Sequence, residues 1–162
     1  MKVFFVFGAL FILFVPTQCD KCVDHRPTPS KDTFDEVFIN TWTHKQLYIP
    51  KTEFWKERML RSYYKCQMHY NCYAMVPAFL YDVYVQACHK SHHTVFWLPV
   101  QRVNGTFINN ENNRPVSMVS TDKTWAWGEP KDDPKKNCAV FKCETSRWYV
   151  EDCEAKNWFI CG

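Results

Sequence analysis

The sequence has few glycines and no excess of charge of one sign. Only four glycines occur among 162 residues, so its long loops must take their shape from proline, asparagine and disulfide bonds. The formal net charge is +3, and acidic and basic residues are mixed along the chain. Because a nucleic-acid-binding protein more often carries a basic stripe, this composition argues against nucleic acid as a partner.

The sequence also lacks the local signatures of common catalytic sites. It contains no serine-centred elbow, no phosphate-binding loop and no His-Glu-x-x-His helix. The paired-cysteine, His-Asp motif of secreted phospholipases is absent as well. Since the histidines and carboxylates that are present lie scattered along the chain, we do not expect an enzyme.

Long apolar runs are missing after the N-terminus. A basic start is followed by an apolar run over residues 3–15, which is too short to span a bilayer comfortably, and by a small, polar exit around Thr17 and Cys19. This pattern is typical of a secretory signal peptide, here residues 1–19, and a retained signal anchor is the alternative. We therefore expect a secreted, extracellular protein without a membrane span.

Cysteine, by contrast, is abundant. The sequence has nine cysteines, and an exported chain places them in an oxidising compartment. An odd count leaves one cysteine unpaired. Cleavage after Cys19 leaves eight in a mature chain that begins at Asp20, although cleavage after Thr17 stays open. Residues 19–22 have the spacing of a redox motif, but no strand precedes them and the expected cleavage divides them.

The predicted secondary structure is two helices followed by short strands. Residues 52–66 repeat apolar side chains at the helical period, which predicts a first helix with Thr52 as its cap. Residues 77–90 predict a second helix with Pro77 in its first turn. Apolar stretches between turn-forming residues predict strands at 94–100, 137–142, 146–150 and 157–161. This order indicates an α+β domain.

The C-terminal third carries a series of spaced motifs. Trp127-Gly128-Glu129-Pro130 precedes Cys138, Trp148 stands five residues before Cys153, and Phe159-Ile160-Cys161 follows near the end of the sequence. In this order and spacing the motifs resemble the C-type lectin-like domain family. Residues 96–98, Phe-Trp-Leu, resemble the family's Trp-Ile-Gly-Leu strand, with Pro99 where a glycine-bearing turn is usual. A generic disulfide-rich secreted fold is the alternative.

The resemblance covers roughly residues 42–162 and implies a C-type lectin-like fold. That fold has two helices, short antiparallel strands and a long irregular loop region, stabilised by disulfides. Residues 20–41 hold prolines and many charges, which indicates an irregular N-terminal lead-in. The resemblance also implies the disulfides Cys66–Cys161 and Cys138–Cys153. For the remaining Cys22, Cys72, Cys88 and Cys143, three connectivities are open; among them we favour Cys72–Cys88 and Cys22–Cys143.

Sugar-binding members of this family hold a calcium ion in the long loop. Its ligands come from a Glu-Pro-Asn or Gln-Pro-Asp tripeptide and from an Asn-Asp pair after the strand tryptophan. This sequence keeps Glu129 and Pro130, and Pro130 is expected to be cis, but Lys131 stands third and residues 149–150 are Tyr-Val. Because calcium takes about six to eight oxygen ligands, we expect no calcium or other metal at the usual site. Nearby acids, Asp132, Asp133, Glu151 and Asp152, are interpreted as solvated turn residues, with an unusual calcium site as the alternative.

The resemblance implies binding of an extracellular glycan. Recognition of a carbohydrate or glycoconjugate is the expected function, and calcium-independent binding of a protein ligand is the alternative. The predicted ligand-binding residues of the loop region are Glu129, Lys131, Trp125 and Tyr149. Aromatic rings in such a loop stack on a sugar or anchor a protein contact. For Trp125, core and surface positions are equally favoured, whereas Trp127 is expected in the core.

Two further motifs bear on modification and metal binding. Asn104-Gly105-Thr106 lies in a polar turn and is an acceptor for N-linked glycosylation, which predicts a glycoprotein. His89, His92 and His93 are spaced to share one helical face and bind zinc. Since Cys88 is expected to be oxidised and the helix to end nearby, an exposed loop is the favoured interpretation.

Overall fold

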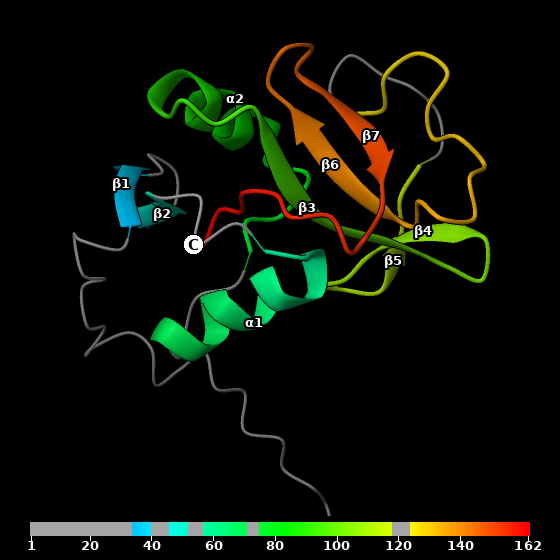
Figure 1. Ribbon diagram of the computed structural model, residues 1–162, viewed down its shortest axis with the longest axis horizontal. Helices are drawn as coiled ribbons and strands as arrows, with labels where there is room; N and C mark the ends of the chain where they lie inside the picture. The colour runs from blue at the N-terminus through cyan, green and yellow to red at the C-terminus, as the bar shows by residue number, and fades with distance from the viewer. Residues whose placement is uncertain (1–33, 40–45, 52–56, 71–74, 118–123) are drawn as a thin grey trace, which may run out of the picture.

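The computed structural model describes residues 34–39, 46–51, 57–70, 75–117 and 124–162 (Figure 1). The elements in chain order are β1 (Phe34–Ile39), β2 (Gln46–Pro50), α1 (Met59–Tyr70), α2 (Tyr81–Lys90), β3 (Val95–Val103), β4 (Thr106–Asn109), β5 (Arg114–Pro115), β6 (Cys138–Lys142) and β7 (Arg147–Glu151). Two helices with short antiparallel strands confirm the predicted α+β class. Within these ranges, no helix is long and apolar enough to cross a membrane.

The centre of the domain is a five-stranded antiparallel sheet in the order β5-β4-β3-β6-β7. Strand β3 is buried from Phe96 to Val100, because elements cover both of its faces. Its pairing with β6 is regular at Phe96 and Trp97 and then shifts before Gln101. Pro99 lies inside the shifted stretch, where a residue without an N–H cannot continue the hydrogen-bond ladder.

Two core layers lie on the two faces of this sheet, with α2 and α1 on opposite sides of β3 (Figure 1). In one layer, the Tyr84 ring of α2 packs on Phe141 with the ring centroids 5.5 Å apart. In the other, Met59 of α1 packs in the cluster that contains Trp97 and Phe159. Aromatic and aliphatic residues that alternate along β3 and β6 therefore face one helix or the other.

Both helices begin later than their apolar periodicity indicates. Helix α1 begins at Met59, because Glu57 exchanges two backbone hydrogen bonds of 3.1 Å with Asn157 and is therefore extended. The predicted cap Thr52 lies outside the described residues. Helix α2 begins at Tyr81, and Pro77 lies in a preceding turn whose carbonyl accepts the Leu80 N–H at 3.0 Å.

The segment 157–161 does not form the predicted strand. It makes single backbone bridges to several separate segments instead. The carbonyls of its residues accept the N–H of Trp97 at 2.7 Å, of Val76 at 2.9 Å and of Tyr48 at 2.9 Å. Its alternating apolar residues fit an extended backbone. Its backbone hydrogen bonds go to several different segments, however, so it does not form a continuous ladder with one partner strand. These bridges join the N-terminal half of the domain to β3.

A two-stranded ribbon lies beside the main sheet, where an irregular lead-in was expected. Strand β1 falls inside residues 20–41 and pairs antiparallel with β2, Phe34 opposite Pro50 and Asp35 opposite Ile49. Its sequence, FDEVFI, is rich in β-branched and aromatic residues, which favour strands. The lead-in is therefore not irregular throughout.

Among the described residues, three disulfides join these elements. Cys66–Cys161 and Cys138–Cys153, the two pairs that the resemblance implied, have Cα separations of 5.4 and 5.1 Å. The third bond joins Cys88 to Cys143 with a Cα separation of 5.5 Å. The expected pairs Cys72–Cys88 and Cys22–Cys143 are therefore wrong, because the last turn of α2 lies beside the end of β6, within bonding range. Cys22 and Cys72 lie outside the described residues.

Candidate functional site

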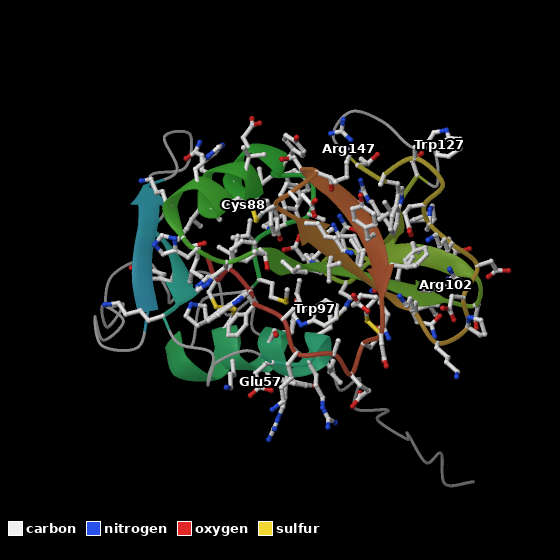
Figure 2. The ribbon with its side chains drawn as sticks, turned by 45° about the horizontal axis from the view of Figure 1, so that its top comes forward. Glu57, Cys88, Trp97, Arg102, Trp127 and Arg147 are labelled. Carbon is white, nitrogen blue, oxygen red and sulfur yellow. A yellow bond between two sulfur atoms is a disulfide. The ribbon has the colours of Figure 1, made fainter. Side chains whose placement is uncertain are left out.

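Trp127 stands at the corner of a tight turn in the long loop. The N–H of Glu129 donates to the Ala126 carbonyl at 3.0 Å, and Gly128 between them has a φ of +79°. A turn with positive φ at its third residue favours glycine, which the Trp-x-Gly-Glu-Pro motif supplies. The Trp127 side chain points away from the body of the protein and is 97% exposed (Figure 2).

Trp125, two residues earlier, is fully buried. Its ring packs on Phe107 and Trp148 at centroid distances of 4.9 and 5.6 Å, and its indole N–H donates to the Ser117 carbonyl at 2.9 Å. The core position expected for Trp127 is therefore wrong, and of the two positions left open for Trp125 the core position is observed. Trp125 is a core residue and not a ligand contact, and Trp127 is exposed and not in the core. The cause is a backbone bridge between Trp125 and Trp148, which directs the first ring inward before the turn directs the second outward.

Glu129 is held by the fold itself. Its side chain is only 6% exposed, and its Oε2 atom accepts the backbone N–H of Val150 at 3.1 Å and of Lys131 at 3.2 Å. Before it, the chain pairs with β7, where the Trp148 N–H donates to the Thr124 carbonyl at 2.9 Å. The Thr124 carbonyl and the Glu129 carboxylate therefore accept N–H groups along the outer edge of β7, which would otherwise be unpaired.

Lys131 adds a positive charge next to this carboxylate. Its Nζ lies 3.8 Å from Glu129 Oε1, and its side chain is 71% exposed. The peptide bond between Glu129 and Pro130 is cis, as the sequence predicted. The structure therefore brings Glu129 and Lys131 together with the turn that carries Trp127.

These residues do not fit a calcium ion. Glu129 Oε2 already accepts two N–H groups, and the Lys131 ammonium stands beside the other oxygen. Like charges repel, so a divalent cation at this position would have to displace the ammonium. No group of three or more His, Cys, Asp or Glu side chains suited to a metal occurs in the described part of the chain. These contacts support the expectation that calcium, which takes about six to eight oxygen ligands, does not bind at Glu129.

Tyr149, another predicted ligand contact, belongs to a different face of the sheet. It lies opposite Val140 in the β6–β7 pairing and packs partly against the core layer that contains Trp97. Lys142 Nζ lies over its ring, 4.5 Å from the centroid. Because Trp148 packs in the layer that contains Trp125, Tyr149 is not grouped with the Trp127 turn.

The histidines near the end of α2 border a separate open cleft of about 380 Å³ beside the Cys88–Cys143 bond. His93 is occupied elsewhere: its ring stacks on Trp158 at a centroid distance of 3.4 Å, and its Nε2 lies 3.0 Å from the Pro50 carbonyl. The exposed His89 and His92 remain at the cleft rim. His93 does not join them in a three-histidine site.

Comparisons with known proteins assign the fold. No protein-family model matches the chain, and no curated protein sequence matches it. Similar solved structures include the mouse scavenger receptor C-type lectin carbohydrate-recognition domain, with a TM-score of 0.57 and 16% identity over 83% of this chain and 96% of that one. Human lithostathine gives a TM-score of 0.56 and 18% identity over 72% and 81% of the two chains. TC14, a C-type lectin from the tunicate Polyandrocarpa misakiensis, gives 0.56 and 14% over 71% and 94%. The chain therefore has a C-type lectin-like fold, as its spaced motifs indicated.

Proposed function

We propose that this protein is a secreted lectin-like binding protein that recognises a carbohydrate or glycoconjugate through the Trp127 turn, without a calcium ion at Glu129. The observation that carries the proposal is the 97% exposure of Trp127 beside a carboxylate that is occupied by the fold. Two of the similar structures are described as C-type lectins, which supports carbohydrate as the ligand class.

The turn is suited to contact because its base is rigid. Trp125 and Ala126 are buried beneath it, and the Glu129 carboxylate fixes its far end to β7. An exposed indole on an anchored turn presents a large apolar face, and the apolar face of a sugar ring stacks on such a surface. A contact residue that is held in place before binding loses little freedom when the ligand arrives.

A protein ligand is the second candidate. Exposed tryptophan is enriched among the residues that dominate protein–protein binding energy, and Lys131 on the same loop is also exposed. This candidate uses the same turn and also needs no calcium ion. We do not propose an enzymatic activity for either case.

The proposal includes export through the secretory pathway. Residues 1–19 serve as the signal peptide, the mature chain begins at Asp20, and residues 42–162 form the lectin-like domain. Three disulfides support an oxidising compartment. Asn104 is exposed at the tip of the β3–β4 hairpin, where its φ is +49°, and we propose that it carries an N-linked glycan.

A glycan array tests the function. The oxidised, mature protein is applied in calcium and in chelator, beside the variants Trp127→Ala and Phe79→Ala. Phe79 is the matched control, because it is 70% exposed but lies in the turn before α2. We expect equal glycan binding in both buffers, loss of binding in Trp127→Ala and full binding in Phe79→Ala. Absence of any bound glycan, or binding only in calcium, contradicts the proposal; the first result favours a protein ligand.

A further inference from the structure

The side chain of Arg102 crosses from the β3–β4 hairpin to the long loop. Its Nη2 donates to the Lys131 carbonyl at 2.6 Å, and its Nη1 contacts Asp132 Oδ1 at 2.6 Å. The guanidinium lies over the Phe107 ring, 4.8 Å from the centroid. In Figure 2, Arg102 lies on the β3–β4 hairpin, and Trp127 lies away from it on the long loop.

Arg102 is also held in place by its own backbone and by burial of its side chain. Its backbone N–H donates to the Asn137 carbonyl at 2.7 Å, and its side chain is only 11% exposed. A guanidinium offers five N–H donors in a planar fork, so one side chain can hold a carbonyl and a carboxylate at the same time. Arg102 therefore links two oxygens of the loop to the β3–β4 hairpin.

These contacts complete a set of three anchors along the loop. The Ala126 N–H donates to the Trp148 carbonyl at 3.0 Å, and Glu129 accepts the Val150 N–H. Arg102 holds the next stretch, after the cis peptide bond. The first two anchors tie the loop to β7, at one edge of the sheet. Of the three, only Arg102 ties the loop to the β3–β4 hairpin, which lies on the other side of β6.

We propose that Arg102 is the positioning residue that holds the loop around Trp127 in its binding form without a divalent cation. A divalent cation bound between oxygens of the loop would hold them together by electrostatic attraction. Here a fixed guanidinium gathers the Lys131 carbonyl and the Asp132 carboxylate, and the Lys131 ammonium lies beside Glu129. The proposal concerns the free protein, so its test needs no ligand and does not depend on the glycan array.

An ordinary surface ion pair is the competing explanation. Asp132 is fully exposed, and exposed pairs contribute little. The two explanations differ in what Asp132→Asn does. If only the ion pair matters, Asp132→Asn and Arg102→Met have equal effects. If the carbonyl contact holds the loop, Asp132→Asn has the smaller effect, because Arg102 still donates to Lys131.

Amide hydrogen exchange by NMR measures the position of the loop directly. The Val150 N–H of β7 donates to Glu129 Oε2, so it reports whether the loop stays on β7. The Lys131 N–H donates to the same oxygen from within the loop, so it reports whether the loop keeps its own conformation. We expect both amides to exchange at least about tenfold faster in Arg102→Met, in calcium and in chelator alike. Arg102→Lys retains one donor group and is expected to restore part of the protection. Arg58→Met is the control, because Arg58 forms a surface ion pair with Glu154 outside the loop.

Trp127 itself supplies the second measurement. In protein labelled with 5-fluorotryptophan, the Trp127 resonance is assigned with Trp127→Phe. We expect Arg102→Met to move or broaden this resonance while that of the buried Trp97, which packs in the other core layer, stays in place. This difference separates loop release from unfolding. Unchanged loop amides and an unchanged Trp127 resonance in Arg102→Met would overturn the proposal. So would slower loop exchange in the wild-type protein when calcium is added.

Discussion

Glu129 closes the outer edge of β7 by accepting the backbone N–H of Val150 at 3.1 Å. Its position in the Trp-x-Gly-Glu-Pro motif implied a ligand of an ion. In this chain the same carboxylate acts as a structural acceptor, because it also receives the Lys131 N–H and lies near the Lys131 ammonium.

Removal of this acceptor is expected to destabilise the domain. Glu129→Ala leaves the partly buried Val150 N–H without its acceptor, which costs about 1–3 kcal/mol in free energy of unfolding, whereas water can replace the acceptor of the exposed Lys131 N–H. Glu129→Gln is expected to cost less, because an amide oxygen still accepts. Urea unfolding measures both. Glu154→Ala is the control, since Glu154 is 65% exposed and its pair with Arg58 is worth at most about 1 kcal/mol. Equal losses in Glu129→Ala and Glu154→Ala would contradict this role.

Thermal melting is expected to be the same in calcium and in chelator. An extracellular calcium site at about ten times its dissociation constant adds roughly 1.4 kcal/mol, which raises the melting temperature of a domain by about 3–6 °C. Because Glu129 and Lys131 do not form such a site, we expect a difference below about 1 °C. A rise of several degrees in calcium would show that a cation binds the folded protein.

The two loop tryptophans are expected to differ in their effect on stability. Trp125→Ala removes a fully buried ring that packs on Phe107 and Trp148 and is expected to cost about 3–5 kcal/mol. Trp127→Ala removes a ring that is 97% exposed, so we expect a change within about 0.5 kcal/mol. Denaturant unfolding of the two variants measures both values. A large loss in Trp127→Ala would mean that this ring packs on the protein.

Peptide mapping of the oxidised protein tests the third disulfide. We expect a peptide that contains Cys88 to be joined to one that contains Cys143, and not to one that contains Cys72. The double variant Cys88→Ala/Cys143→Ala is expected to fold and to lose roughly 2–4 kcal/mol of stability. Recovery of a Cys72–Cys88 peptide would refute the observed pairing.

Glu111 is expected to make stability depend on pH. Burial raises the pKa of this half-buried carboxyl from 4.5 to about 7, so the folded state favours its protonated form. Its contribution to stability is therefore complete below about pH 4.5 and is lost as the pH rises through about 7. Urea midpoints between these values measure the effect, and Glu111→Gln, which cannot ionise, is the control. A wild-type profile parallel to that of Glu111→Gln would contradict the raised pKa.

Sequence patterns predicted those helices and strands that the local sequence determines. Apolar periodicity and turn residues placed both helices and the strands β3, β6 and β7, since each element carries its own pattern. The predicted start of α2 was wrong because residues 77–80 form a turn before the helix. The predicted start of α1 was wrong because a distant residue decides it. Asn157 pairs with Glu57 and keeps the backbone there extended, although the apolar spacing continues through it.

The site was harder to predict for the same reason. Trp125 and Trp127 are two residues apart and chemically identical, and only the bridge to Trp148 and the turn at Gly128 separate core from surface. The Cys88–Cys143 bond depends on how α2 packs beside β6, which spacing does not reveal. Arg102 gave no signal in the sequence, because its partners lie about thirty residues away.

The bridges made by residues 157–161 also set the order of events during synthesis. A nascent chain that ends at residue 150 contains the residues of both helices, but Trp97, Val76 and Tyr48 still lack their backbone acceptors. Cys66 likewise has no Cys161 to oxidise with. The Cys66–Cys161 bond therefore cannot form at this stage. The domain therefore closes only after the ribosome has passed the last of these residues.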